Sequence, residues 1–261
     1  MRSLRLLLLA ALLAPGSARA QDRFEIQVYE AEINEPLRPG VQLHLNYTVA
    51  GRSAPAYAGE APPDRATRLT LEPAFGVTEF LELGGYLQTV YTPGDGFQYA
   101  GVKLRALGIV PRRLTGAFDA GLNVEVSVVP RAAEAETWGA ELRPIFGWRS
   151  RWISAWINPI ISFALSGASP LRPEFEPAAR VSVNTQLGFG LGLEYYAGLG
   201  AFADGFLPLN DQTHLLFATF DLLDRPSEEP SAWSLNAGIG VGLTSGSAQR
   251  LVVKAIVGRS F

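Results

Sequence analysis

The sequence predicts an all-β protein: a transmembrane antiparallel β-barrel of about twelve strands, preceded by a cleaved N-terminal signal peptide. Apolar and polar residues alternate along several segments long enough to cross a bilayer, aromatic residues gather at matching ends of these segments, and the N-terminal apolar run is too short to span a membrane as a helix. The chain has 48% hydrophobic residues, 18% charged residues and no cysteine. A disulfide scaffold and a cysteine metal site are therefore excluded.

Residues 1–20 have the order of a secretory signal. Arg2 and Arg5 precede a short apolar run, Pro15 interrupts it, and Ala18 and Ala20 provide the small residues of a cleavage site. Removal of this segment leaves 19 basic and 25 acidic residues, a net charge of −6. We therefore expect no nucleic-acid partner, and with only two histidines we expect no metal site and no cofactor.

Alternation defines the barrel domain, residues 40–261. In the first segment Val41, Leu43 and Leu45 alternate with Gln42 and His44, which is typical of a strand with one apolar and one polar face. The same reading along the chain predicts strands at 40–50, 66–76, 79–92, 96–108, 116–129, 136–147, 151–165, 174–186, 187–201, 212–223, 232–244 and 248–261.

Two of these segments are ambiguous. Pro159 lies inside 151–165, and a proline within a strand indicates an edge or a bulge. Segment 212–223 is apolar on both faces, so its inward side stays open.

Aromatic residues distinguish a membrane barrel from a soluble sandwich, because a barrel carries aromatic girdles at the membrane interfaces. With the first strand rising from the periplasm, the predicted periplasmic ends hold Phe75, Phe80, Phe118, Phe146, Trp148, Trp152, Trp233 and Phe261. Bacterial single-chain barrels also have an even strand number with both termini on the periplasmic side. Segment 24–33 alternates early on and would make a thirteenth strand, so we interpret residues 21–39 as a periplasmic or lumen-entering segment instead.

The last strand ends in Phe261, and a terminal amphipathic strand with a final aromatic residue resembles the signal that the barrel-assembly machinery recognises. Arg259 departs from that pattern, since it lies on the apolar face, where a long basic side chain can snorkel to the interface. Outer-membrane lipid and the assembly machinery are the expected partners.

Three blocks, 175–180, 191–200 and 252–261, together with 24–29, resemble a family of proteobacterial outer-membrane barrels similar to the transporters named for the MetA pathway of phenol degradation. The resemblance spans most of the mature chain. It implies an outer-membrane barrel of Gram-negative bacteria with a transport role and without assigned site residues.

With the apolar face turned to lipid, acidic and basic residues together point into the lumen. The solute-contact candidates are Arg105, Arg180, Glu141, Glu194, Lys103 and Glu125. We expect a channel or transporter for a small solute, hydrophobic or aromatic by the family resemblance. The alternative is a structural or surface-interaction barrel whose lumen is plugged by paired charges, since inward polar residues are required by any barrel of this type. Inward glycines such as Gly84 and Gly240 would leave space in the lumen or, alternatively, ease the curvature of the strands. We expect no enzyme, because neither His44 nor His214 has a serine beside it on a strand face.

Overall fold

The computed structural model describes residues 22–167, 170–185, 187–223 and 233–261. Its elements are β1 (Pro39–Gly51), β2 (Thr67–Thr78), β3 (Leu81–Thr92), β4 (Gly96–Ile109), α2 (Arg112–Thr115), β5 (Phe118–Val128), β6 (Trp138–Arg149), β7 (Ile153–Asn158), β8 (Ile161–Ala164), β9 (Pro173–Phe175), β10 (Ala178–Asn184), β11 (Phe189–Gly198), β12 (Gly200–Ala201), η1 (Phe202–Asp204), β13 (Thr213–Leu222), β14 (Trp233–Gly242) and β15 (Gln249–Ser260). No helix in these ranges is long and apolar enough to span a membrane.

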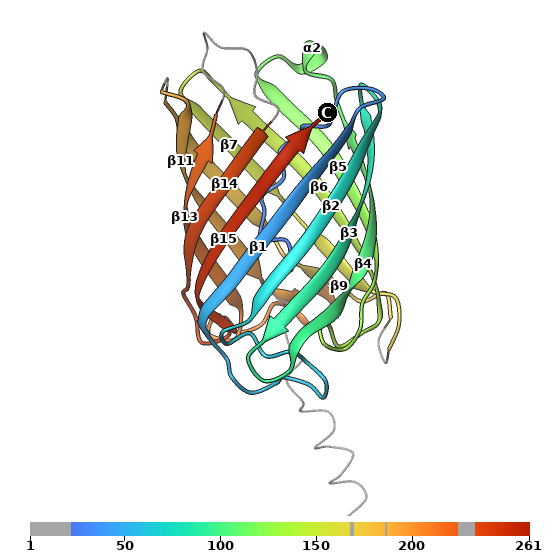
Figure 1. Ribbon diagram of the computed structural model, residues 1–261, viewed down its shortest axis with the longest axis vertical. Helices are drawn as coiled ribbons and strands as arrows, with labels where there is room; N and C mark the ends of the chain where they lie inside the picture. Colours follow the sequence, from blue (N-terminus) through green and yellow to red (C-terminus); the bar gives the residue numbers. More distant parts are fainter. Residues whose placement is uncertain (1–21, 168–169, 186, 224–232) are drawn as a thin grey trace, which may run out of the picture.

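All strands belong to one antiparallel sheet that closes on itself (Figure 1). Strand β1 pairs with β2 on one side and with the last strand, β15, on the other, in a register that runs from Gly40 opposite Ser260 to Gly51 opposite Gln249. The pairs β7 and β8, β9 and β10, and β11 and β12 are the two halves of single long strands, so the barrel has twelve strands. The predicted transmembrane antiparallel barrel and its strand number are confirmed, whereas the predicted signal peptide, residues 1–20, lies outside the described residues.

Prolines break two of these long strands. Pro159 separates β7 from β8 and Pro177 separates β9 from β10, because proline has no N–H to donate to the ladder. The Glu176 amide donates to the Ile160 carbonyl at 3.0 Å and so carries the ladder across the break. The break between β7 and β8 lies at Pro159, where the sequence predicted an irregularity in segment 151–165.

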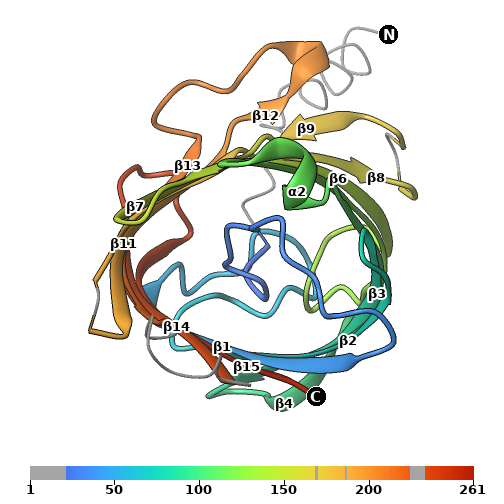
Figure 2. The ribbon, with the colours of Figure 1, turned by 90° about the horizontal axis from the view of Figure 1, so that it is seen from above.

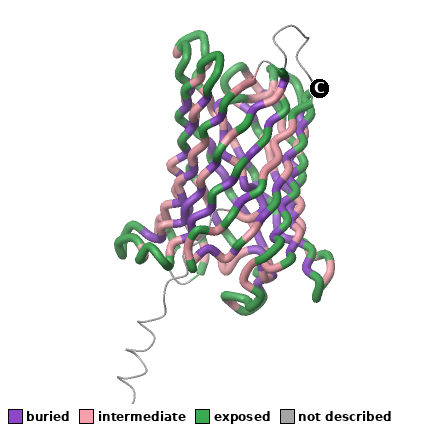
Figure 3. The backbone as a smooth tube through the Cα atoms, turned by 90° about the vertical axis from the view of Figure 1, so that its left-hand side faces the viewer, coloured by how far each residue is buried: buried purple, intermediate pink, exposed green. Residues whose placement is uncertain are grey.

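The two faces of the wall have opposite character, and buried and exposed residues alternate along the strands (Figure 3). In β1, His44, Asn46 and Thr48 are buried in the lumen whereas Leu43 and Leu45 are exposed on the outside. In β13, whose sides the sequence left open, Leu215 and Phe217 face inward and Leu216 and Phe220 face outward. Inward apolar residues are tolerated in β13 because Leu215 and Phe217 pack in a buried apolar cluster with Ile26 and Val28, which lie inside the barrel.

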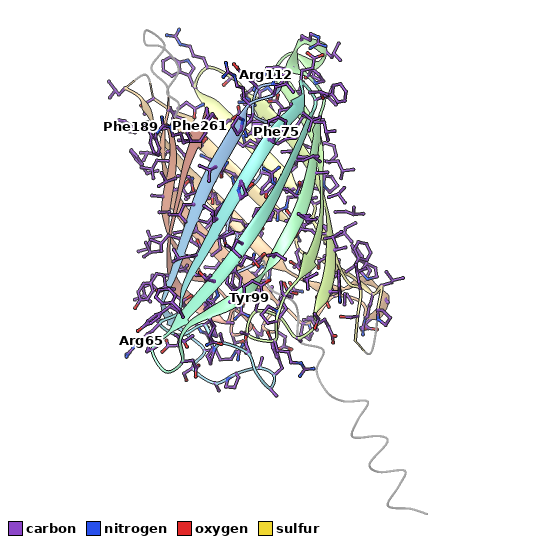
Figure 4. The ribbon with its side chains drawn as sticks, turned by 45° about the vertical axis from the view of Figure 1, so that its right-hand side comes forward. Arg65, Phe75, Tyr99, Arg112, Phe189 and Phe261 are labelled. Atoms are coloured by element: carbon purple, nitrogen blue, oxygen red, sulfur yellow. The ribbon has the colours of Figure 1, made fainter. Side chains whose placement is uncertain are left out.

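The outer face carries aromatic residues at both ends of the barrel. All the aromatic residues predicted for the periplasmic end, Phe75 and Phe261 among them, are exposed there, and Tyr99 lies near the opposite end (Figure 4). The guanidinium of Arg259 lies 4.9 Å from the ring centroids of both Trp233 and Phe261, so this basic side chain belongs to the aromatic girdle.

A closed barrel with an apolar outer band and aromatic girdles is built to face lipid, and this architecture places the protein in the outer membrane of a Gram-negative bacterium. The end that carries Pro39 and Phe261 is called the periplasmic end here, because both termini of the barrel sheet lie there. It is the upper end in Figure 1.

Glycines on the inner face do not leave empty space, so that part of the sequence interpretation is wrong. A Cβ at Gly84 would lie 2.9 Å from Arg105 Nε, and one at Gly240 would lie 2.5 Å from the Phe217 ring. At Gly84 and Gly240 a neighbouring large side chain takes up the space, whereas at Gly242 the Gln249 main chain does. Gly188, predicted inside a strand, lies in the turn before β11 with a φ of 86°.

We predict that Gly147→Ala lowers the unfolding free energy by about 1–3 kcal/mol, the usual cost of overpacking. A Cβ at Gly147 would overlap the ring of Trp156, which is buried on the opposite strand. The measurement is the temperature at which the refolded barrel loses its folded gel mobility. Gly94→Ala is the matched control, because a Cβ at Gly94 meets nothing within 4 Å; equal effects of the two variants would contradict the prediction.

Candidate functional site: the lumenal strap and two cavities

Residues 22–38, called the strap below, form no strand and run lengthwise through the lumen (Figure 2). At the periplasmic end the Leu37 amide donates to the Gly76 carbonyl at 2.7 Å. At the other end the Arg23 guanidinium donates to Glu60 at 3.0 Å, in the loop between β1 and β2. The strap therefore extends from one mouth of the barrel to the other.

The strap lacks a strand partner, so side chains of the wall bind its main chain. Without them its buried carbonyls would be unpaired, which is costly. The wall side-chain nitrogens donate to strap carbonyls as follows: Asn46 to Phe24 (3.0 Å), Lys254 to Ile26 (2.9 Å), Arg143 to Gln27 (3.3 Å) and Asn158 to Tyr29 (3.0 Å). Asn158 also accepts a bond from the Tyr29 amide at 2.6 Å, so its side chain acts like a neighbouring strand.

A hydrogen-bonded group around Lys103 holds the extracellular half of the strap. Lys103 pairs with Asp22 and, at 3.2 Å, with Glu25 of the strap, and it also lies 3.4 Å from Glu125 of the wall. The Tyr29 hydroxyl donates to Glu25 at 2.7 Å. Of the predicted candidates, Lys103 thus binds the end of the strap, and Glu125 lies beside Lys103.

Arg105 belongs to a second group of paired charges. Its guanidinium lies 2.7 Å from both Glu72 and Glu82, and Glu82 in turn accepts a bond from the Asn34 amide of the strap at 2.7 Å. Glu141, which shares the inward face with Arg105, pairs instead with Arg143 of its own strand at 2.7 Å. The structure therefore does not bring Arg105 and Glu141 together.

Arg180 and Glu194 are neighbours across β10 and β11, and their Nε and Oε1 atoms are 3.8 Å apart. Arg180 pairs more closely with Glu30 of the strap, at 3.0 Å, and also with Asp221. Glu194 pairs with Lys254, the residue that binds the Ile26 carbonyl. This third group fixes the middle of the strap to the wall.

Apolar side chains close the middle of the lumen. Ile26 and Val28 of the strap pack in one buried cluster with Trp156, Phe217 and other apolar residues of the wall. These wall residues explain the inward apolar positions of β13. The cluster occupies the lumen at the level of residues 26–28 of the strap.

Two cavities flank this apolar cluster. The periplasmic cavity has a volume of about 340 Å³, and its lining includes Glu30, Arg180 and Glu194. The extracellular cavity is larger, about 690 Å³, and Lys103, Glu125 and Glu141 contribute to its lining. Of the predicted solute-contact residues only Arg105 lines neither cavity.

The loop from 52 to 66 folds into the extracellular mouth and meets the strap at Glu60. The Glu60 carboxylate accepts bonds from Arg23 at 3.0 Å, from Arg52 at 2.9 Å and from the Ala56 amide. Burial by itself raises the pKa of Glu60, but the hydrogen bonds from Arg52 and Ala56 and the charge of Arg23 outweigh it and hold the pKa below its ordinary value. Glu60 is therefore ionised at neutral pH and joins the loop to the strap.

The residues that sequence reasoning missed are the anchors of the strap main chain: Asn46, Arg143, Asn158 and Lys254. Alternation placed Asn46, Arg143 and Lys254 on the inward face, whereas Asn158 lies in the ambiguous segment 151–165. Alternation cannot show that the partner of these side chains is a segment distant in the sequence. In the described ranges no group of three or more histidine, aspartate or glutamate residues could hold a metal ion.

We predict that Arg105→Met lowers the unfolding free energy of the refolded barrel by about 3–5 kcal/mol, because it leaves two buried carboxylates without their cation. Both Glu72 and Glu82 are nearly fully buried beside it. Denaturant titration of the refolded protein is the measurement. The exposed pair of Arg113 and Glu79 supplies the control, since Arg113→Met is expected to leave the transition where it is. Transitions that coincide for both variants would refute the role of the buried pairs.

The Glu60 interactions also predict a pH dependence. Because the folded-state pKa is lowered, the stability that Glu60 contributes is fully present above the ordinary carboxyl pKa, about 4.3, and is lost as the pH falls through the lowered value. The thermal stability of the wild type should therefore exceed that of Glu60→Gln from pH 7 to pH 5, and the two should converge in more acidic solution. A difference that stays constant down to pH 2 would rule out this account.

No family model matches the sequence, and no curated protein matches it. The solved structures with a similar fold include three outer-membrane barrels. The KdgM porin has a TM-score of 0.55 at 7% identity and covers 85% of this chain and 99% of its own. The COG4313 outer-membrane channel from Pseudomonas putida F1 has a TM-score of 0.57 at 13% identity and covers 91% of this chain and 100% of its own. The NanC porin has a TM-score of 0.52 at 9% identity and covers 85% of this chain and 98% of its own. At these identities the likeness shows the fold, that of porin-like outer-membrane barrels.

Proposed function

We propose that this protein is an outer-membrane channel for a small solute and that the strap is its gate. The observation that carries the proposal is the arrangement of the lumen: a cavity at each end, with residues 26–29 of the strap and their apolar contacts between them. The porin-like fold supports a role in passage across the membrane. A solute can enter either cavity from its own side, but it passes from one to the other only when the strap moves.

The strap is the movable element because of how it is bound. The wall strands are held by continuous hydrogen-bond ladders. The strap is held instead by separate side chains from β1, β2, β3, β4, β6, β7, β10 and β15 and by the main-chain bond from Leu37 to Gly76. Breaking these contacts costs much less than opening the closed sheet. Movement of the strap would rehydrate the charged groups of the wall, which then line the path.

The chemical class of the solute is inferred from the family resemblance and from the lining of the cavities. Family resemblance implies a hydrophobic or aromatic solute, and this remains a prediction. The cavities combine both characters, because Phe24, Tyr57 and Leu207 line the extracellular cavity together with Lys103 and Glu141. A small amphipathic solute suits such a lining.

The rival function is a structural or surface-interaction barrel that transports nothing. It is favoured by the pairing of the candidate charges, each of which has an opposite charge within 4 Å. Under this reading the strap is a permanent part of the interior. We also propose that the protein is no enzyme, since the His44 ring pairs with Glu72 and the His214 ring with Tyr195 and Gln212.

We predict that Asn158→Leu increases the open probability of single channels in planar bilayers by about tenfold or more. Leucine has a similar size but removes both hydrogen bonds to Tyr29, together worth roughly 1–3 kcal/mol. The wild type should be closed most of the time. Bilayer recording of the refolded proteins measures both quantities.

Arg113→Met serves as the control, because it removes an ion pair outside the lumen and should leave the open probability at the wild-type value. Deletion of residues 22–33 should give a persistently conducting barrel. If the deletion variant folds, as judged by its heat-modifiable gel mobility, and remains silent, the gate proposal fails and the plugged structural barrel is the better description.

A further inference from the structure

Arg68 of β2 is a buried cation that forms no ion pair with any of the residues that the structure describes. Its side chain points into the lumen and is only 1% exposed. Its Nε and Nη1 atoms lack a hydrogen-bond partner, and no carboxylate of the described residues forms an ion pair with it. Its nearest ring contact is Phe24 of the strap, whose centroid lies 5.5 Å from the guanidinium carbon. Arg105 and Arg143, which are buried to a similar degree, both have carboxylate partners.

The surroundings of Arg68 are unsatisfied in the same way. Asn46 is its neighbour in register on β1, and Gln88 faces inward on β3, diagonally across from Arg68 and in register with Thr70. The side-chain oxygens of Asn46 and Gln88 also lack hydrogen-bond donors. Three adjacent strands thus present unpaired polar atoms to one spot in the extracellular half of the lumen.

The nearby acids do not neutralise Arg68, because they are committed elsewhere. Glu60 accepts bonds from Arg23 and Arg52, and Asp22 pairs with Lys103. Arg23 adds a further positive charge on the same side. A buried charge without a partner is costly in a folded protein, and such groups are usually found where an ion or a solute group completes them.

We propose that Arg68 is the anchor of a binding site for the carboxylate group of an anionic solute. A planar guanidinium with free N–H groups matches a carboxylate in shape and charge, and this pairing is favoured over contact with an ammonium-type or neutral group. Water or a hydroxyl group of the solute can donate to the oxygens of Asn46 and Gln88.

Phe24 covers the site. Its ring contacts the Arg68 guanidinium and also lines the extracellular cavity, whose lining does not include Arg68. Displacement of the strap end at Asp22 to Phe24 would open Arg68 to the 690 Å³ cavity. A solute entering from outside would then exchange the ring of Phe24 for its own contacts with Arg68.

This inference rests on the proposed function in one respect: the solute enters the lumen. Its test measures binding and does not depend on whether the barrel conducts. The probe is benzoate, titrated by calorimetry into the refolded mature chain in detergent, with benzamide as a neutral molecule of the same shape. We expect benzoate to bind at least about tenfold more tightly than benzamide, since a charge-assisted hydrogen bond contributes roughly 1.5–3 kcal/mol. Phe24→Ala should strengthen benzoate binding by uncovering the site.

Arg68→Met should weaken benzoate binding about tenfold or more, whereas Arg68→Lys should retain part of it, and Arg113→Met should leave it unchanged. In the absence of benzoate, Arg68→Met should melt at a higher temperature than the wild type, because an uncompensated charge is removed. Equal binding of benzoate and benzamide, wild-type affinity in Arg68→Met, or no benzoate binding in both wild type and Phe24→Ala would overturn the site. A silent bilayer with intact benzoate binding would count against the channel alone.

Discussion

The interior of this barrel depends on one requirement: the main chain of the strap is buried in the lumen without a strand beside it. Its carbonyl groups therefore need donors from side chains of the wall. Asn46, Arg143, Asn158 and Lys254 supply these donors from four different strands. The strap in turn fills the space that closed strands of this number enclose, and its Ile26 and Val28 turn the middle of the lumen into a small apolar core.

The pairing of the lumenal charges follows from that core. Once the strap excludes water, the inward acids and bases lose hydration and persist only with partners. Glu25, Glu30 and Asn34 of the strap bring such partners to Lys103, Arg180 and Glu82. Most of the inward charges belong to these groups, which is why acids and bases alternate around the lumen instead of forming a filter of one sign.

Much of the fold could be predicted from the sequence because the barrel wall is a local pattern. From Leu43 to Val49 each residue of β1 faces lipid or lumen according to its parity. Closure with β15 needs only an even strand number and a matching last strand. Segment 212–223 resisted prediction because Leu215 and Phe217 face an apolar core that a distant segment creates. The partners of Arg105 could not be predicted either. Parity places Glu72, Glu82 and Glu141 all on the inward face, like Arg105. Which of these carboxylates Arg105 meets depends on how far its side chain reaches across β3 and β2.

The binding of the strap also decides how such a gate would respond to a solute. A closed state favoured by about 3 kcal/mol leaves the open state populated below 1%, and a solute shifts that population only if it binds the open state more tightly. Arg68 behind Phe24 offers such a difference, since it is covered in the closed state and uncovered when the strap end leaves. Glu60 favours the closed state instead, because it holds Arg23 of the strap to the loop 52–66 at the extracellular mouth. The two interactions lie at the same end of the strap, so the extracellular end, rather than the apolar middle, is where a solute from outside would begin to release it.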